Sequence, residues 1–270
     1  MPLNLARMVC MRRTNFHERH PASTVRSPAT GKATLSQHQD RIRPFLANNT
    51  FLGRFPGVVI DALVGKGQLR SFAKGDVVYR RGDPGDSLMV VIKGRIKLTN
   101  TTINGKEIVL YYVGPGDIFG DIAALDGKER AVDTVALEDS EVFVVYTRDL
   151  LPTLTNHPSA MFEVVRALCE KIRIGAAIVE DNTLEMRGRT ARGLLRLARR
   201  HGRMGTGGAH LRLTISQEEL GKFLGMSRAN VNRQLGQLKI AELIRINGTE
   251  ISIIDEKGLA DIGEAPATKD

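Results

Sequence analysis

The feature that most constrains the fold of this chain is a change in hydrophobic period near residue 157. Before that point, short β-rich runs alternate with glycine-containing turn signals, among them Asn104-Gly105. After it, apolar residues recur at intervals of three and four, as they do along one face of a helix. Short strands separated by turns at this spacing favour an antiparallel sandwich or roll. The sequence therefore predicts an α+β chain with an N-terminal antiparallel β-roll and a helical C-terminal part.

The same signals place the individual elements of the N-terminal part. A helix with proline in its first turn is predicted over 56–66. The Asn104-Gly105 pair lies between two β-rich runs and predicts a hairpin there. The predicted strands cover 76–79, 87–93, 95–100, 106–113, 131–137 and 141–146.

A single long helix is predicted to follow Pro158 and to carry an apolar stripe. A stripe on one long helix between two domains must be buried, and the same helix of a second subunit is the economical partner. The alternative is that the stripe packs only against its own domain. The stripe consists of Met161, Val164, Val165, Leu168, Cys169, Ile172, Ala176 and Val179.

The predicted organisation has five parts. Residues 1–43 lack apolar periodicity and are predicted to be a disordered basic tail. The other four parts are a β-roll domain at 44–156, a dimerisation helix at 157–186, a winged helix-turn-helix at 187–258 and a flexible tail at 259–270.

Charge and cysteine content narrow the function classes. Residues 187–245 carry 13 Lys and Arg against 3 Asp and Glu, within sequence that is periodic enough to fold. Such a basic stretch favours a polyanion partner, nucleic acid first, although a solvated basic face is the alternative. The two cysteines, Cys10 and Cys169, are too few for a disulfide framework or a four-cysteine cluster. With no apolar run of bilayer length and no secretory signal, we expect a cytoplasmic protein without a membrane partner.

The segment around Gly225 predicts two helices joined by a tight turn. Ser216 begins the first helix and forms a capping box with Glu219, while Ser227 begins the second. Gly225 permits the left-handed backbone that such a turn needs. The runs at 243–246 and 250–254, joined by Asn247-Gly248, predict a two-stranded wing.

The second helix is predicted to read double-stranded DNA. Its outward positions suit the first turns of a recognition helix, which enter the major groove. Arg bonds guanine bidentately and Asn bonds adenine in the same way, whereas Ser216, Gln217 and Ser227 are better placed for phosphates. The alternative is an ordinary helical hairpin with polar outer faces. The outward positions are Arg228, Ala229, Asn230, Asn232 and Arg233.

At these residues, and from Phe45 to Ile254, the sequence resembles the CRP–FNR family of bacterial regulators. In the N-terminal part the resemblance rests on glycines at fixed offsets, which are typical of a cyclic-nucleotide-binding β-roll. They lie in the runs Phe72-Ala73-Lys74-Gly75-Asp76, Arg81-Gly82-Asp83-Pro84-Gly85-Asp86-Ser87, Gly94-Arg95-Ile96 and Pro115-Gly116-Asp117-Ile118-Phe119-Gly120-Asp121.

The resemblance implies a phosphate-binding cassette after Phe119. Arg130 stands at the position of the arginine that neutralises the cyclic phosphate. Asp121 replaces the usual glutamate, and Ala131 replaces the usual Ser or Thr hydroxyl. The residues implied for effector binding are Gly120, Asp121, Ile122, Ala123, Arg130, Ala131, Ile174 and Gly175.

These departures leave the effector open. Ile174 and Gly175 align with the adenine-contacting Thr-Ser pair of the family and offer no side-chain hydrogen bond to a base. Each lost hydrogen bond is worth roughly 0.5–1.5 kcal/mol, so affinity for cyclic AMP is expected to fall. Cyclic AMP and cyclic GMP are the candidate effectors, and another ligand or none stays open.

Taken with the resemblance, the sequence predicts a homodimeric, sequence-specific DNA-binding transcription regulator gated by a small effector. It would bind a pseudo-palindromic operator, and RNA polymerase is a further candidate partner at the 203–209 loop. One alternative is a regulator that binds DNA without an effector and keeps the β-roll as a dimerisation scaffold. Another is a cyclic-nucleotide-binding regulatory subunit of an enzyme. The sequence has no P-loop, metal-ligand spacing or paired nucleophile and base, so we expect no enzyme activity of its own.

Overall fold

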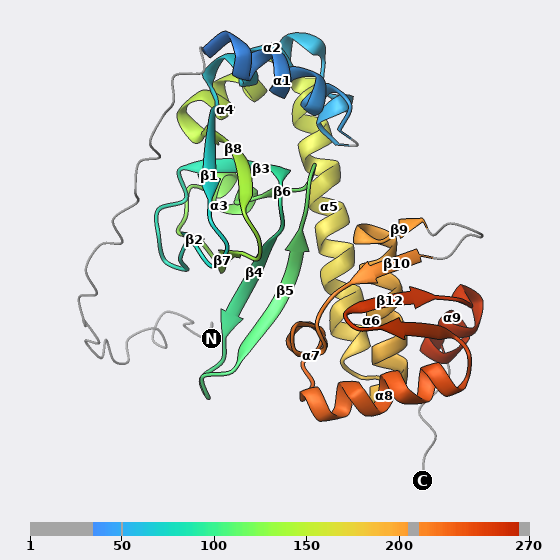
Figure 1. Ribbon diagram of the computed structural model, residues 1–270. Coiled ribbons are helices and arrows are strands. Elements are labelled where there is room, and N and C mark those ends of the chain that lie inside the picture. The colour runs from blue at the N-terminus through green and yellow to red at the C-terminus, as the bar shows by residue number, and fades with distance from the viewer. Residues whose placement is uncertain (1–34, 50, 205–210, 265–270) are drawn as a thin grey trace, which may run out of the picture. The chain divides into compact units, whose positions relative to one another are not determined.

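The computed structural model describes residues 35–49, 51–204 and 211–264 (Figure 1). Over these ranges, the helices all fall short of the length or apolar character that crossing a membrane requires. Two four-stranded antiparallel sheets form the N-terminal domain, in the orders β1-β8-β3-β6 and β2-β7-β4-β5. Their strands are β1 (Gln68–Phe72), β2 (Val77–Tyr79), β3 (Ser87–Lys93), β4 (Ile96–Thr101), β5 (Glu107–Val113), β6 (Ile118–Phe119), β7 (Asp133–Ala136) and β8 (Ser140–Tyr146).

The predicted antiparallel β-roll is confirmed, and the six predicted strands lie within one or two residues of β2, β3, β4, β5, β7 and β8. The Asn104-Gly105 turn joins β4 to β5, and Gly105 adopts a left-handed φ of +74° there. Two strands were missed, β1 and the two-residue β6. Side chains of facing strands fill a shared core that includes Ile96, Val113 and Phe119.

Helices cover one end of the roll and bury a second apolar cluster. Helix α2 (Gly57–Lys66) matches the predicted helix, with Pro56 as its N-cap rather than in its first turn. Helix α4 (Thr147–Thr155) was not predicted. The remaining elements of this end are α1 (Leu35–Ala47) and the single-turn η2 (Leu52–Arg54).

The boundary predicted for the basic tail was wrong for residues 35–43. They belong to α1, where Ile42 and Leu46 are each 1% exposed because they pack into the cluster beneath α2 and α4. The rest of the predicted tail, residues 1–34, lies outside the described residues. The error arose because only these two residues are buried between positions 40 and 47, which leaves little apolar periodicity in the sequence.

The C-terminal domain packs four helices around a third sheet of order β11-β12-β10-β9. Its core joins Leu194, Leu220, Leu235 and Ile251, each at most 3% exposed. Its elements are α6 (Met186–His201), β9 (Arg203–Met204), β10 (Leu211–Thr214), α7 (Gln217–Leu224), α8 (Arg228–Ile240), β11 (Ile244–Asn247), β12 (Glu250–Ile253) and α9 (Glu256–Glu264).

The predicted wing is the β11–β12 hairpin, which pairs Asn247 with Glu250. The predicted flexible tail at 259–270 was wrong for residues 259–264, which form the last part of α9. Leu259 is fully buried against the domain core, and this contact fixes the helix. Residues 265–270 lie outside the described residues. The long helix α5 (Pro158–Asp181) precedes this domain and confirms that a long helix follows Pro158. The predicted end at 186 was wrong, because the helix stops at Asp181 and Met186 already begins α6.

The turn between α7 and α8 depends on a left-handed glycine. Gly225 has φ +67° and ψ +23°, and its N–H donates to the carbonyl of Gly221. A Cβ added to Gly225 would meet no atom within 4 Å, so the constraint is conformational rather than steric. Gly236, in the middle of α8, also has open space for a Cβ but lies in helical backbone.

These two glycines give a matched pair of predictions. We expect Gly225→Ala to destabilise the α7–α8 unit by about 1–2 kcal/mol, because an L-residue there is strained. Gly236→Ala should stabilise it by about 0.8–1 kcal/mol, because alanine is the better helix former. Hydrogen exchange of the α7 and α8 amides in the full chain measures both. Equal exchange in the two variants would contradict this account of the turn.

Candidate nucleic-acid interface and ligand cassette

One edge of α8 exposes polar side chains near the helix N-terminus. Arg228, Ala229, Asn232 and Arg233 are exposed and Asn230 is half-buried, while Val231 and Leu235 on the opposite side are buried. We call Arg228, Ala229, Asn230, Asn232 and Arg233 the reading edge. The outward and inward positions predicted from the sequence are therefore those of the structure. The arrangement presents these side chains to the base edges of a groove. Within the chain, Arg233 Nη2 donates to Asn230 Oδ1 at 3.4 Å and contacts Met186 Sδ at 3.9 Å.

Serine side chains begin both helices of the pair. Ser216 Oγ accepts from the Glu219 N–H at 3.1 Å, and Ser227 Oγ accepts from the Asn230 N–H at 3.2 Å. Each hydroxyl still has its own proton to donate, for example to a phosphate oxygen. Gln217 is half-buried in the first turn of α7. The three predicted phosphate contacts thus lie at the starts of the two helices.

Only half of the predicted capping box is formed. The backbone N–H of Glu219 makes the cap, but its carboxylate turns toward the β-roll instead of returning to Ser216. There it lies 3.0 Å from the Tyr112 hydroxyl and 3.7 Å from Lys97 Nζ. Sequence reasoning missed this contact, because the partners lie more than a hundred residues apart and carry no local signal.

The ligand cassette begins at Gly120 and continues into the short helix α3 (Asp121–Asp126). Gly120 adopts φ +72°, and a Cβ there would come within 2.7 Å of Arg130 Nη1. Arg130 itself is 3% exposed. Its Nη1 donates to the carbonyls of Ser87 and Gly120, both at 2.8 Å, and its Nη2 donates to Ser87 Oγ at 2.8 Å. The arginine predicted to neutralise a cyclic phosphate therefore makes most of its hydrogen bonds within the chain.

The environment of Arg130 is apolar on one side and acidic on the other. Its guanidinium lies 4.4 Å from the centre of the Tyr79 ring and 3.7 Å from the Asp86 carboxylate. Burial lowers the pKa of Arg130, and the nearby Tyr79 and Asp86 oppose that shift. Burial likewise raises the pKa of Tyr79. Arginine stays protonated in proteins and carries five N–H donors, of which three are used here. The buried Nε–H and the second N–H of Nη2 have no hydrogen-bond partner among the described residues.

Asp121 pairs with a residue of α5 rather than with Arg130. Both of its carboxylate oxygens lie 2.7 Å from Lys171 Nζ of α5. A cavity of about 1580 Å³ is lined by Asp121, Lys171 and Ile174, whereas Arg130 and Ala131 do not line it. The carboxylate and the arginine that would hold one nucleotide thus do not both line this cavity. Of the other predicted effector residues, Ile122 and Ala131 are exposed, Ala123 is buried, and Gly120, Ile122, Ala123 and Gly175 are absent from its lining.

The long helix α5 carries two apolar faces rather than one stripe. Met161, Val164 and Leu168 pack against the core of the β-roll. The second face follows intervals of three and four residues and is exposed, with Ile172 71% and Val179 68% exposed. We call this second face the α5 stripe. It consists of Phe162, Val165, Cys169, Ile172, Ala176 and Val179.

Comparisons with known proteins agree with this architecture. A family model for the cyclic nucleotide-binding domain matches residues 69–157, and one for the Crp-like helix-turn-helix domain matches residues 188–262. The CRP-like cAMP-activated global transcriptional regulator of Mycobacterium tuberculosis (strain CDC 1551 / Oshkosh) is 30% identical over 213 residues, covering 77% of this chain and 95% of that protein.

Two proteins of Thermus thermophilus are also similar. Its cyclic AMP receptor protein is 29% identical over 206 residues, which is 75% of this chain and 91% of that protein. One of its CRP/FNR family transcriptional regulators, known from a crystal structure, is 27% identical in sequence. The match covers 73% of this chain and 99% of that protein, and the two structures superpose with a TM-score of 0.57. The present chain belongs to the CRP–FNR family of DNA-binding transcription regulators, and its matched domains and relatives are those of regulators rather than of enzymes.

Proposed function

We propose that the chain acts as a homodimer in which each copy inserts α8 into the major groove of one half of a pseudo-palindromic operator. The observation that carries the proposal is the exposed reading edge on a capped helix within the helix-turn-helix domain. Recognition helices contact bases with their first turns, which is where this edge lies. The excess of basic residues over 187–245 would attract the phosphate backbone.

The reading edge fits a defined set of base contacts. Arg228 and Arg233 can each bond guanine O6 and N7, while Asn230 and Asn232 can bond adenine N6 and N7. Ala229 can only make an apolar contact, for which the thymine methyl group is suited. Ser216, Gln217 and Ser227 would hold phosphates and so set the register on the duplex. RNA polymerase stays a candidate partner, but residues 205–209 of the loop proposed for it lie outside the described residues.

The α5 stripe supports the dimer. Its six residues follow the a and d spacing of a coiled coil, and an exposed apolar seam of this length is typical of an interface. The other apolar face of α5 is already covered by the β-roll, so the stripe is free for the same stripe of a second copy. A two-fold pair would bring two reading edges to one side of the duplex.

We further propose that the dimer binds DNA without a cyclic nucleotide. Two curated relatives are named for cyclic AMP, but three features of this chain oppose that ligand. Arg130 is bonded internally, Asp121 is paired with Lys171, and Arg130 does not line the 1580 Å³ cavity that Asp121 lines. Ala131, Ile174 and Gly175 add no side-chain hydrogen bond. Gating by cyclic AMP, cyclic GMP or another small effector is the alternative.

The reading helix can be tested with a duplex selected from a random pool by the wild-type chain. We expect Arg228→Ala and Arg233→Ala each to cost about 1–3 kcal/mol of binding, or roughly 5- to 150-fold in Kd, and to relax the preference at one base pair. Gln237→Ala, at an exposed position further along α8, is the matched control and should bind as the wild type. If both arginine variants keep affinity and base preference, α8 is not the reading helix.

The dimer can be tested by placing a charge in the α5 stripe. Ile172→Arg should convert the chain to a monomer, because the charge would be buried without a partner in the paired helices. Glu170→Arg puts the same side chain at an exposed position off the stripe and should leave the dimer intact. Sedimentation velocity at micromolar concentration distinguishes them. A dimer in both variants would place the subunit contact elsewhere.

Calorimetric titration tests the effector proposal. We expect the full chain to give no saturable heat with cyclic AMP or cyclic GMP at micromolar concentration. Operator affinity should be the same with and without either nucleotide. A saturable heat together with a nucleotide-dependent gain in operator affinity would establish gating instead.

A further inference from the structure

Four alternating charges close a ring between the β-roll and the first helix of the DNA-binding pair. Glu107 of β5 accepts from Lys97 of β4 at 2.7 Å and from Lys222 of α7 at 3.0 Å. Glu219 of α7 lies 3.4 Å from Lys222 and 3.7 Å from Lys97. We call Lys97, Glu107, Glu219 and Lys222 the four-charge ring. Two of its members belong to the β-roll and two to α7. Both contacts between these halves, Glu107 with Lys222 and Lys97 with Glu219, join opposite charges and are attractive.

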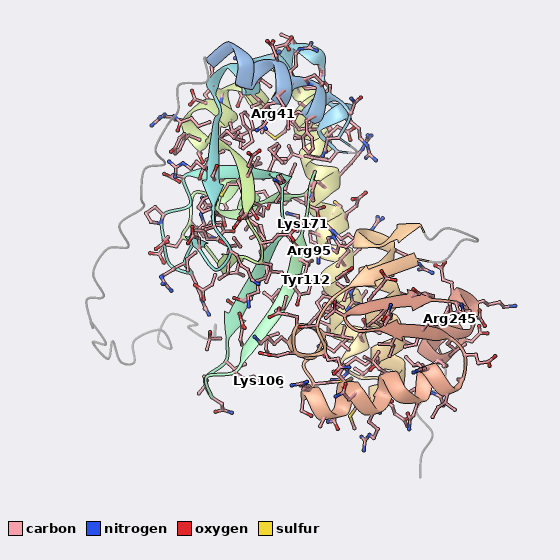
Figure 2. All side chains as sticks on the ribbon, viewed as in Figure 1. Arg41, Arg95, Lys106, Tyr112, Lys171 and Arg245 are labelled. Carbon is pink, nitrogen blue, oxygen red and sulfur yellow. The ribbon has the colours of Figure 1, made fainter. Side chains whose placement is uncertain are left out.

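The ring lies against a buried aromatic contact. Tyr112 of β5 is 4% exposed and belongs to the apolar core of the C-terminal domain, with its ring centre 5.7 Å from that of Phe223. Its hydroxyl lies 3.0 Å from both the carbonyl and a carboxylate oxygen of Glu219. Burial and the Glu219 charge raise the pKa of Tyr112, so the phenol stays protonated and donates. Figure 2 labels Tyr112 on β5 beside the C-terminal domain.

The charged side chains of the ring are partly buried, and their ion pairs favour the ionised forms. The side chain of Lys97 is 10% exposed, and those of Glu107, Glu219 and Lys222 are between 23% and 30% exposed. Burial raises the pKa of Glu107, but its bonds to Lys97 and Lys222 more than offset this and hold that pKa below its ordinary value. Such partly buried pairs are screened by salt much less than surface pairs are.

Two flanking contacts join the same surfaces. Lys106 Nζ donates to the carbonyl of Gly225 at 3.3 Å, directly at the turn before α8. Arg95 donates to the carbonyl of Thr214 at 3.1 Å, just before α7. Both side chains are labelled in Figure 2. The β4–β5 hairpin and the residue before it therefore contact α7 and the residues on either side of it.

We propose that the residues of the four-charge ring are positioning residues for DNA reading: they dock α7 on the β4–β5 hairpin and so present the reading edge in one arrangement. The inference rests on the proposed function, since it concerns how the same helix meets an operator. The ring contacts α7 and leaves the reading edge of α8 exposed. Docking therefore covers none of the side chains that would read DNA, and releasing it would uncover no further DNA-reading side chain.

If α7 leaves the β4–β5 hairpin, operator affinity should fall, because the reading edge is no longer held in one arrangement. A dimer reads two half-sites at a fixed spacing, so both reading edges must be held at the matching separation. If the docked arrangement falls from dominant to about one molecule in ten, the apparent Kd rises about tenfold. No DNA contact is lost in that case, and only the fraction of competent molecules changes.

Reversing one half of the ring at a time isolates the contacts between the halves. The variant Lys97→Glu/Glu107→Lys keeps the ion pair within the β-roll and the net charge. It sets two lysines against each other at positions 107 and 222, and two glutamates at positions 97 and 219. The variant Glu219→Lys/Lys222→Glu makes the matching reversal from the side of α7. All variants and their reference are made in a Glu218→Gln background, because Lys222 also pairs with Glu218 at 3.3 Å and a glutamate at position 222 would repel that carboxylate. The fourfold variant, which carries all four reversals, restores opposite charges across the interface. Tyr112→Phe removes only the hydroxyl and serves as a milder probe.

Two measurements on the full chain are compared. Fluorescence anisotropy with the selected duplex gives operator affinity, and amide hydrogen exchange of β5 and α7 without DNA reports docking. Each half-reversed variant should bind about tenfold more weakly and exchange faster at both elements. The fourfold variant should recover to within about threefold of the reference. Tyr112→Phe should weaken binding by a smaller factor in the same direction.

The outcomes separate this inference from the proposed function. If the half-reversed variants bind and exchange as the reference, or if the fourfold variant fails to recover, the ring does not position the reading helix. If the wild-type chain selects no duplex at all, the proposed function fails. The exchange comparison still tests docking in that event, because it uses no DNA.

Discussion

The arrangement of the C-terminal domain depends on an apolar contact that crosses from one domain into the other. Val109 and Tyr112 of β5 are at most 4% exposed because they are part of the same core as Leu220 and Leu224 of α7. Burial of apolar surface is the dominant favourable term in such a contact, and it also shields the charged groups around it from part of the surrounding water. The polar contacts of α7 can then be specific, since few competing partners remain in reach.

A second anchor holds the domain at the end of α5. Asp181, the last residue of that helix, is 3% exposed and accepts from Arg196 and, at 3.3 Å, from Arg192. Arg196 also lies 5.1 Å from the centre of the Phe223 ring on α7. A buried carboxylate of this kind is tolerated because two guanidinium groups pair with it. The helix that carries the α5 stripe and the helix pair that would meet DNA are thus joined through a few side chains.

The side chains of the ligand cassette have partners within the chain. Gly120 adopts a left-handed conformation, and the Arg130 guanidinium takes the space that a Cβ at position 120 would need. The hydrogen bonds of Arg130 go to Ser87 and Gly120, so they tie the cassette to β3. Asp121 ties the same cassette to α5 through Lys171. The site therefore has a structural role in joining three elements, whatever ligand it meets.

Much of the fold and the reading edge could be predicted from the sequence, because local rules decide them. The alternation of β4 and β5, the left-handed glycines at 105 and 225 and the serine caps at 216 and 227 each depend on residues within a few positions of one another. The inward and outward sides of α8 follow from the helical period alone. The sequence by itself thus determined where most strands, turns and helices begin and which side of α8 is polar.

Only the tertiary structure decided which residues that are far apart in the sequence contact one another. It divided the α5 apolar residues into a face on the β-roll and an exposed stripe, turned Glu219 from its capping box toward Tyr112, and paired Asp121 with Lys171 rather than with Arg130. The helical period cannot separate two adjacent apolar faces, and a side chain near several partners takes the one that packing brings closest. The partners of Glu219 and Asp121 lie 107 and 50 residues away. No local pattern encodes such a distance, because it is set when the two domains bury their common core.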